Sequence, residues 1–319
     1  MADLSVCVGI DAGSCESKLA YADKLSTRIL ARLEGFDLTA LREEAEAFFE
    51  EPVFSCVTAL PDGNRRLRTE GTGFTEVYEI PQSEAVILGL GREGRNIVYD
   101  LGALAGRIYV VDGQEVIESE NITDFCGKTI DRDFEEYITE RFRLNTKDPS
   151  ISSETRRIKH ALTENDSAVW HEVRIFRYEL ERLIHFPAKR TARVIQRLCR
   201  VYQPEGVILT GNSVKIPEVR RVIAEVTGMT PEYMGNLVAE GAALRAMELQ
   251  KDSARAKTAG IPDTAARLRE LRADVLAIED KLTRKQKDRV YAMFRQAEGI
   301  NDAGIITLME NLIRDIKHV

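Results

Sequence analysis

The stretch GIDAGS, at residues 9–14, joins two apolar runs and is followed four positions later by Lys18. The alternation before it and the apolar run from Lys18 to Ala22 after it predict two strands connected by a glycine turn. Glycine lets backbone N–H groups approach phosphate oxygens closely. Ser14 can donate to a phosphate, Lys18 supplies positive charge, and Asp11 can hold water molecules around a magnesium ion. Taken alone, such a turn is also typical of an ordinary β-hairpin.

The same pattern returns in IVYDLG at residues 97–102, where Asp100 ends an apolar strand beside another glycine turn. This pair of segments is the nearest approach to an internal repeat in the chain. Two carboxylates, Asp11 and Asp100, one from each of two similar units, can flank a single magnesium–phosphate group.

A third turn lies in VILTGNSVKIP at residues 207–217. Gly211 and Asn212 leave room for a flat ring, and Lys215 can lie over the face of that ring. Pro217 lies where the first turn of a helix tolerates proline, so a helix is expected to follow the turn.

In this order, the three motifs resemble the phosphate-1, phosphate-2 and adenosine motifs of the superfamily that contains actin, sugar kinases and heat-shock ATPases. Four segments are similar to the DnaK-type heat-shock branch, at residues 77–89, 124–137, 207–219 and 240–243. The resemblance is collinear over residues 6–249. Each motif is unspecific alone, whereas the ordered set is specific.

The resemblance implies an α/β fold of two ribonuclease H-like lobes, with a nucleotide between them and a helical extension at the C-terminus. It implies ATP or ADP with Mg²⁺, which Asp11 and Asp100 would hold through water, and it places Gln82 where the family orients the attacking water. The residues implied to contact the nucleotide are Gly13, Ser14, Lys18 and Gly102 at the phosphates, Gly211, Asn212, Ser213 and Lys215 at the adenine, and Lys159 at the ribose and adenine.

The sequence departs from the family pattern in two places. Only about thirty residues separate Ala22 from Val53, so the outer subdomain that carries the family's catalytic lysine is expected to be largely missing. Lys18, with the spacing of actin's phosphate lysine, would compensate.

The second turn has DLGALAGR at residues 100–107 where the family has DLGGGTxD. Each lost hydrogen bond to a charged phosphate oxygen costs about 1.5–3 kcal/mol, so binding is expected to survive better than hydrolysis. Arg107, in place of an acidic residue, either adds a phosphate contact or faces solvent.

We expect four parts in the chain: lobe I at residues 1–95, lobe II at 96–249, a polar linker at 250–263 and a helical tail at 264–319. Apolar residues of the tail recur at spacings of three and four, which predicts a short helical seam. Few strand-like runs follow residue 263, so the β-rich peptide-binding domain of DnaK-type chaperones is not expected. The tail either packs against its own body or mediates association.

The composition excludes several classes of function. The 319 residues carry a formal net charge of −7, which disfavours nucleic-acid binding over a broad surface. No run approaches the roughly 18 apolar residues that span a membrane, and residues 1–8 predict a strand rather than a signal peptide. Five cysteines without paired spacing favour reduced thiols in the cytoplasm. The four histidines lie too far apart to suggest a metal site.

Two functions from different classes are consistent with these observations. The first is an ATP-binding, slowly hydrolysing, chaperone-like switch, whose lobes close on ATP and relax on ADP and transmit the change to the tail or a protein partner. The second is a catalytically degenerate scaffold that binds a protein partner. Whether the chain is an ATPase stays open at this point. A small-molecule kinase is less favoured because no second substrate site can be identified, and actin-like filament formation also stays open.

Overall fold

The computed structural model describes residues 6–62, 67, 69, 71–144 and 150–258, with single residues and pairs between 271 and 294. The chain divides into two compact units. One runs from Val6 to Met247, and the second contains the residues from Glu248 onward. The first unit holds every strand of the described chain and all three sequence motifs.

Lobe I consists of five strands and two helices: β1 (Cys7–Asp11), β2 (Glu16–Ala22), β3 (Thr27–Glu34), α1 (Leu38–Phe49), β4 (Ser55–Leu60), β5 (Glu76–Pro81) and α2 (Gln82–Leu90). Its sheet has the order β3-β2-β1-β4-β5. The pairs β1–β2 and β2–β3 are antiparallel, whereas β1–β4 and β4–β5 are parallel. Leu38, Leu41 and Ala45, on one face of α1, pack into the core of this sheet. Three residues separate β3 from α1, so no further subdomain is inserted between them.

The sheet of lobe II repeats this arrangement. Its strands are β6 (Arg95–Leu101), β7 (Gly106–Asp112), β8 (Glu115–Ile122), β11 (Gly206–Thr210) and β12 (Glu232–Tyr233), in the order β12-β11-β6-β7-β8. The pairs β6–β7 and β7–β8 are antiparallel, and β6–β11 and β11–β12 are parallel. Order and direction therefore match lobe I strand by strand. The two sheets confirm the predicted two-lobed α/β fold.

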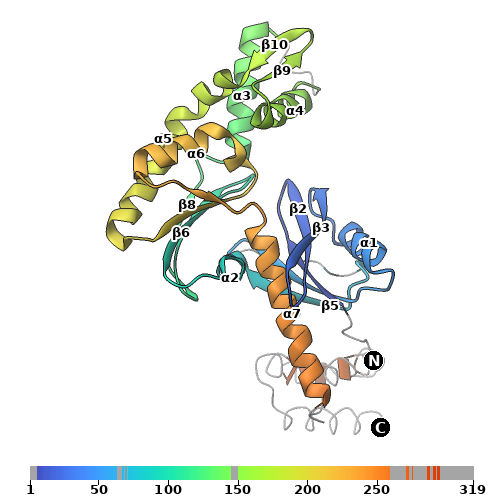
Figure 1. Ribbon diagram of the computed structural model, residues 1–319. Coiled ribbons are helices and arrows are strands. Elements are labelled where there is room, and N and C mark those ends of the chain that lie inside the picture. Colours follow the sequence, from blue (N-terminus) through green and yellow to red (C-terminus); the bar gives the residue numbers. More distant parts are fainter. Residues whose placement is uncertain are drawn as a thin grey trace. The chain divides into compact units, whose positions relative to one another are not determined.

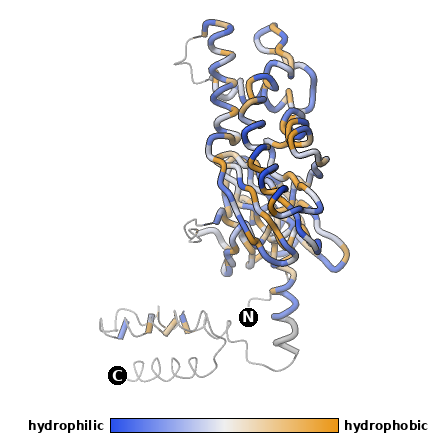
Figure 2. The backbone as a smooth tube through the Cα atoms, turned by 90° about the vertical axis from the view of Figure 1, so that its left-hand side faces the viewer, coloured by the Kyte–Doolittle hydropathy of each residue, from blue (hydrophilic) through white to orange (hydrophobic). Residues whose placement is uncertain are grey.

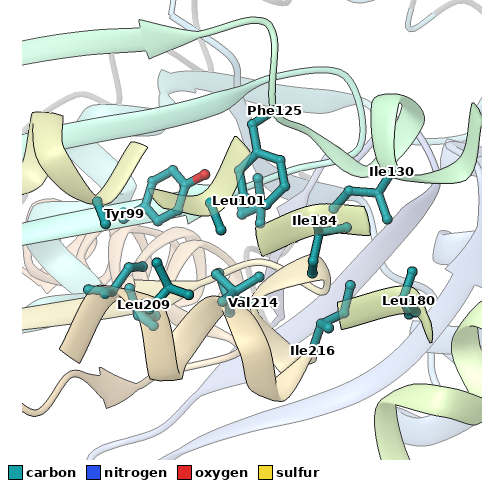
Figure 3. Close-up of a cluster of buried hydrophobic side chains, with 14 of the residues drawn as sticks. Tyr99, Leu101, Phe125, Ile130, Leu180, Ile184, Leu209, Val214 and Ile216 are labelled. Carbon is teal, nitrogen blue, oxygen red and sulfur yellow. The ribbon is translucent and has the colours of Figure 1, made fainter. Parts of the chain in front are cut away.

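The remaining elements of lobe II build its hydrophobic core. They are α3 (Gly127–Phe142), α4 (Ser150–Glu164), the ribbon of β9 (Ser167–Trp170) and β10 (Val173–Phe176), α5 (Arg177–Tyr202), a short 3₁₀ helix (Ser213–Lys215) and α6 (Pro217–Thr227). Tyr99 and Leu101, on one face of β6, pack there with Phe125 and with Ile184 of α5 (Figure 3). Alternate residues of a strand face the same side, so Asp100 points away from this core.

The last helix of the unit, α7 (Leu237–Thr258), crosses α2 at backbone contact (Figure 1). A Cβ at Gly241 would lie 1.8 Å from the Ala85 carbonyl oxygen, and one at Gly89 would lie 2.1 Å from that of Leu237. A Cβ at Gly9 of β1 would lie 2.1 Å from the Ala243 nitrogen. The helix that follows lobe II therefore packs directly against lobe I, and only glycine allows this approach.

Several elements differ from the sequence-based expectations. The strands β3, β5, β8, β9, β10 and β12 were not predicted. α5 runs from Arg177 to Tyr202 as one helix with Pro187 inside it. Residues 250–258, predicted to belong to a linker, continue α7. The division into four parts at the predicted boundaries stays a prediction.

Most of the predicted tail at residues 264–319 lies outside the described residues, although Leu271 and Val275 of the apolar seam are described. The tail residues that are described are helical. Among them Leu271 and Phe294 are buried, and the guanidinium of Arg272 lies 5.4 Å from the centre of the Phe294 ring.

No helix within the described ranges is long and apolar enough to cross a membrane. Hydrophilic residues recur along the helices of lobe II between the hydrophobic ones (Figure 2).

Candidate functional site between the two glycine turns

The first glycine turn connects β1 to β2 and is held by its own backbone. A Cβ at Gly13 would lie 2.0 Å from the Glu16 carbonyl oxygen, so the turn requires glycine there. The Ser17 hydroxyl donates to the carbonyl oxygens of Gly13, at 3.2 Å, and Gly35, at 2.6 Å. Ser14, one of the predicted phosphate ligands, is exposed on the turn.

Asp11 and Lys18 pair across the strands that flank this turn. Lys18 is only 5% exposed, and its Nζ lies 3.9 Å from Asp11 Oδ2. The same ammonium group donates to the Gly235 carbonyl oxygen at 2.9 Å. A buried lysine is thus held between a carboxylate of lobe I and the segment that precedes α7.

The second turn has an equivalent pair, because Asp100 lies opposite Arg107 on β6 and β7 as Asp11 lies opposite Lys18. Asp100 is buried and accepts a hydrogen bond from Gln82 Nε2, at the first residue of α2. Arg107 donates to Gln82 Oε1 at 2.6 Å. The guanidinium therefore contacts the side chain implied to orient water.

The backbone of the second turn is occupied by internal hydrogen bonds. The Gly102 N–H donates to the Ala105 carbonyl at 3.1 Å. The carbonyl oxygens of Gly102 and Ala103 accept from the N–H groups of Gly127, at 2.9 Å, and Lys128, at 2.8 Å, at the start of α3. Leu104 is 60% exposed, so its side chain does not fill the space beside the turn.

The two carboxylates share one electrostatic environment. Burial raises the pKa of Asp11 to about 6, the positive charge of Lys18 opposes this, and the charge of Asp100 adds to it. Burial likewise raises the pKa of Asp100, against the lowering effects of Lys18, Arg107 and the Gln82 hydrogen bond. Two carboxylates withdrawn from solvent, each with a raised pKa, favour a bound cation. In the described chain, however, no group of three or more acidic, cysteine or histidine side chains has the geometry of a metal site.

The third turn lies directly against the second. Gly211 has φ +88°, and a Cβ there would lie 2.6 Å from the Leu101 carbonyl oxygen and 2.7 Å from Asp100 Oδ1. In the described chain, Asn212 Oδ1 is buried without a hydrogen-bond partner. The Ser213 hydroxyl oxygen would lie 3.1 Å from a Cβ placed on Gly127, and Lys215 is exposed.

Sequence reasoning missed a polar group that joins the lobes beside this turn. Arg32 of β3 donates to Glu16 Oε1 at 2.9 Å and to Asn236 Oδ1 at 2.5 Å. Burial alone would raise the pKa of Glu16, but hydrogen bonds from Asn212 and Arg32 lower it overall. The only sequence signal was the position of Arg32, which a strand pairing would place opposite Lys18.

No direct contact joins Lys159 to the other predicted site residues, all of which the structure describes. It is buried and forms an ion pair with Asp131 of α3. The pKa of its neighbour His160, in contrast, is influenced by a carboxylate of lobe I. Burial and the charge of Lys159 lower the pKa of His160, and Asp131 and Glu16 of lobe I act in the opposite direction.

The structure thus brings Asp11, Lys18, Gln82, Asp100 and Gly211 into one neighbourhood of the two lobes. Two surface pockets are formed elsewhere in lobe II, one beside Trp170 and His171 and the other beside His185 and Glu218. Neither is lined by a predicted site residue.

The paired sheets, each with a carboxylate ahead of a glycine turn, define a two-lobed domain of the actin-like ATPase class. No family model matches the chain. The relatives that the chain matches include heat-shock chaperones, so the chain is similar to the DnaK-type heat-shock branch.

The chain is 27% identical over 252 residues to a chaperone protein HscA homolog of Acidovorax ebreus, an alignment that covers 68% of this chain and 40% of that protein. It is 27% identical over 261 residues to the mitochondrial-type heat shock protein 70 of Encephalitozoon cuniculi, covering 67% of this chain and 44% of the relative. A chaperone protein HscA homolog of Haemophilus influenzae is 28% identical over 204 residues. The chain covers about 40% of the length of the first two relatives.

Proposed function

We propose that this chain binds an adenine nucleotide with Mg²⁺ between the turns of lobes I and II, as a chaperone-related molecular switch. The observation that carries the proposal is the pair Asp11 and Asp100. They come from equivalent strands of the two repeated sheets, Asp11 half-buried and Asp100 buried, and the charge of Lys18 lowers the pKa of both. A divalent cation bound through water would compensate their charge.

The proposed contacts follow the three turns. Gly13, Ser14, Lys18 and Gly102 contact the phosphates, and Asp11 and Asp100 hold the water shell of Mg²⁺. Gln82, next to Asp100, orients the attacking water. Gly211, Asn212, Ser213 and Lys215 frame the adenine, with Lys159 at the ribose side.

The unpaired Oδ1 of Asn212 supports the adenine assignment. A buried acceptor without a donor costs free energy, and the exocyclic amino group of adenine supplies such a donor. Guanine presents an acceptor at the equivalent ring position, so this contact favours adenine.

We propose that turnover is slow. The backbone N–H of Gly102 is already used within the turn, and Ala103 and Leu104 carry side chains where the family has glycine. Fewer free donors reach the terminal phosphate, and transition-state stabilisation in phosphoryl transfer depends on such donors.

Isothermal titration of the full chain with Mg-ATP and Mg-ADP tests the proposal. We expect measurable binding of both, a loss of at least about tenfold in affinity for Lys18→Met, because a charge-assisted phosphate contact is removed, and no change for Lys24→Met on the exposed β2–β3 turn. Absence of heat at high micromolar protein, with the fold intact by circular dichroism, would refute nucleotide binding.

A second function, a scaffold that retains the ATPase fold without turnover, is favoured by one observation. Arg107 and Asp100 both bind Gln82, so the side chain that would orient water is occupied. In that case a protein partner binds the lobes or the helical tail. A steady-state ATPase signal that disappears in Asp11→Asn would count against the scaffold.

The remaining parts of the proposal concern cell biology. All five cysteines are free thiols in the structure, which is consistent with a reducing compartment, and we propose the cytoplasm. We also propose that the switch transmits its state to a protein partner.

A further inference from the structure

Two basic side chains of lobe I hold the residues that immediately precede α7. Lys18 Nζ donates to the Gly235 carbonyl oxygen at 2.9 Å, and Arg32 donates to Asn236 Oδ1 at 2.5 Å. Lys18 and Arg32 are direct neighbours on β2 and β3. α7 begins at the next residue, Leu237. The first turn of this helix is therefore anchored by two adjacent side chains from the other lobe.

The ammonium group of Lys18 that contacts Gly235 also lies beside the phosphate turn. Lys18 lies opposite Asp11, whose strand leads into the turn at Gly13. A phosphate oxygen is a stronger acceptor for an ammonium group than a neutral carbonyl, because both partners are charged. A phosphate bound at the turn would therefore draw Lys18 away from Gly235. Arg32 points to Glu16 and Asn236 instead, and stays in place.

The start of α7 is weakly held by its own backbone. The Leu237 N–H donates to the Met234 carbonyl only at 3.4 Å, near the limit for a hydrogen bond, whereas the Glu240 N–H reaches Asn236 at 2.9 Å. Helix termini leave their first N–H groups without intrahelical partners. External anchors consequently decide how often this turn opens.

We propose that Lys18 is a phosphate-responsive latch: in the nucleotide-free chain it holds Gly235 and fixes the start of α7, and bound phosphate releases this contact. The inference rests on the proposed nucleotide binding. Because α7 crosses α2 at backbone contact, a change at its start moves the helix against lobe I. The latch gives the chain a route from the phosphates to α7 that uses no inserted subdomain.

Amide hydrogen exchange of the full chain tests the latch in the segment 235–241. We expect exchange there to accelerate about tenfold or more on saturation with Mg-ADP, because loss of a buried hydrogen bond to a charged donor favours local opening. Lys18→Met should accelerate it to a similar extent without nucleotide and abolish the response. Lys24→Met, on the same hairpin but exposed, should behave as the unmodified chain.

Asn236→Ala provides a second variant that leaves Lys18 and the phosphate turn intact. It should raise exchange in the segment 235–241 with and without Mg-ADP and retain the response to the nucleotide. This variant also keeps the test valid if Lys18→Met fails to fold, which circular dichroism would report.

Calorimetry on the same samples separates the two proposals. No heat with Mg-ADP refutes nucleotide binding, and unchanged exchange in nucleotide-free Lys18→Met then overturns the anchoring role as well. If Mg-ADP binds but exchange in the segment 235–241 is unchanged or slower, nucleotide binding stands and the latch is wrong.

Discussion

The turn after β1 and the turn after β6 lie on matching strands of two equivalent sheets, yet they differ in what they leave free. In the first, glycine is required by a close backbone approach, and a buried lysine lies beside Asp11. In the second, the Gly102 N–H donates a hydrogen bond to the Ala105 carbonyl within the turn, and Arg107 donates one to Gln82. The repeated fold therefore fixes where the carboxylates lie, whereas the turn residues decide whether donors remain for a ligand.

The largest expected effect is on folding and comes from glycine substitution. Gly13→Ala places a Cβ 2.0 Å from a backbone oxygen, whereas Gly102→Ala places one 3.0 Å from the Ala105 oxygen. We expect the free energy of unfolding to fall by about 2–4 kcal/mol in the first variant and by about 1 kcal/mol or less in the second. Urea denaturation measures both. Equal losses would show that the two turns are equally constrained.

The next-largest effect is a pH-dependent change in the free energy of unfolding when the carboxylate charge of Asp11 is removed. The folded-state pKa of Asp11 is raised from 3.8 to about 6, so folding favours the protonated form. The contribution of Asp11 to stability is therefore lost as pH rises from about 4 through 6. Asp11→Asn should stabilise the chain at pH 7, on the order of 2 kcal/mol, and by little near pH 4.

Asp100→Asn should also stabilise the chain at pH 7, because burial raises the pKa of Asp100 too. Denaturation curves between pH 4 and pH 7 check both variants. A stability difference independent of pH would contradict the assigned ionisation, and opposite signs would break the equivalence of the two carboxylates.

Restoring glycine to the second turn should make it behave more like a phosphate turn. The triple variant Ala103→Gly, Leu104→Gly and Ala105→Thr recreates the family pattern. We expect ATP turnover to rise about tenfold, since one recovered phosphate hydrogen bond is sufficient for this factor. Steady-state ATPase assays measure it, with Gln114→Gly in the neighbouring β7–β8 turn as the control. Unchanged turnover would place the defect outside this turn.

The smallest effect is expected at Arg107. Arg107→Gln removes a hydrogen bond to a partly buried side chain, so the free energy of unfolding should fall by about 0.5–1 kcal/mol. Affinity for Mg-ATP should change by less than about threefold in calorimetry, whereas Lys18→Met should lose at least about tenfold. A comparable loss in the two variants would show that Arg107 contacts phosphate after all.

Local signals predicted much of the fold and the position of the site. Glycine turns between apolar strands marked the ends of β1, β6 and β11, and the family resemblance carried by the order of these turns implied two lobes. β3 and β8 were missed because charged or polar residues alternate along both, as in Glu115–Ile122, so neither forms an apolar run. Polar edge strands of this kind are defined by pairing, which a single sequence does not display.

The contacts between the lobes could not be predicted. Lys18 and Gly235 are separated by 217 positions, and Arg32 and Asn236 by 204. Nothing in the local sequence of either pair selects its partner. Lys159 was named from the resemblance alone, and its ion pair with Asp131 depends on how α3 and α4 pack.

The contact of α2 with α7 has a consequence for mutational tolerance. At Gly89 and Gly241 the backbones of α2 and α7 lie against each other, and at Gly9 the backbone of β1 lies against that of α7. Any added methyl group meets main-chain atoms that cannot move aside. A saturation library scored for folded protein should therefore retain glycine alone at these three positions.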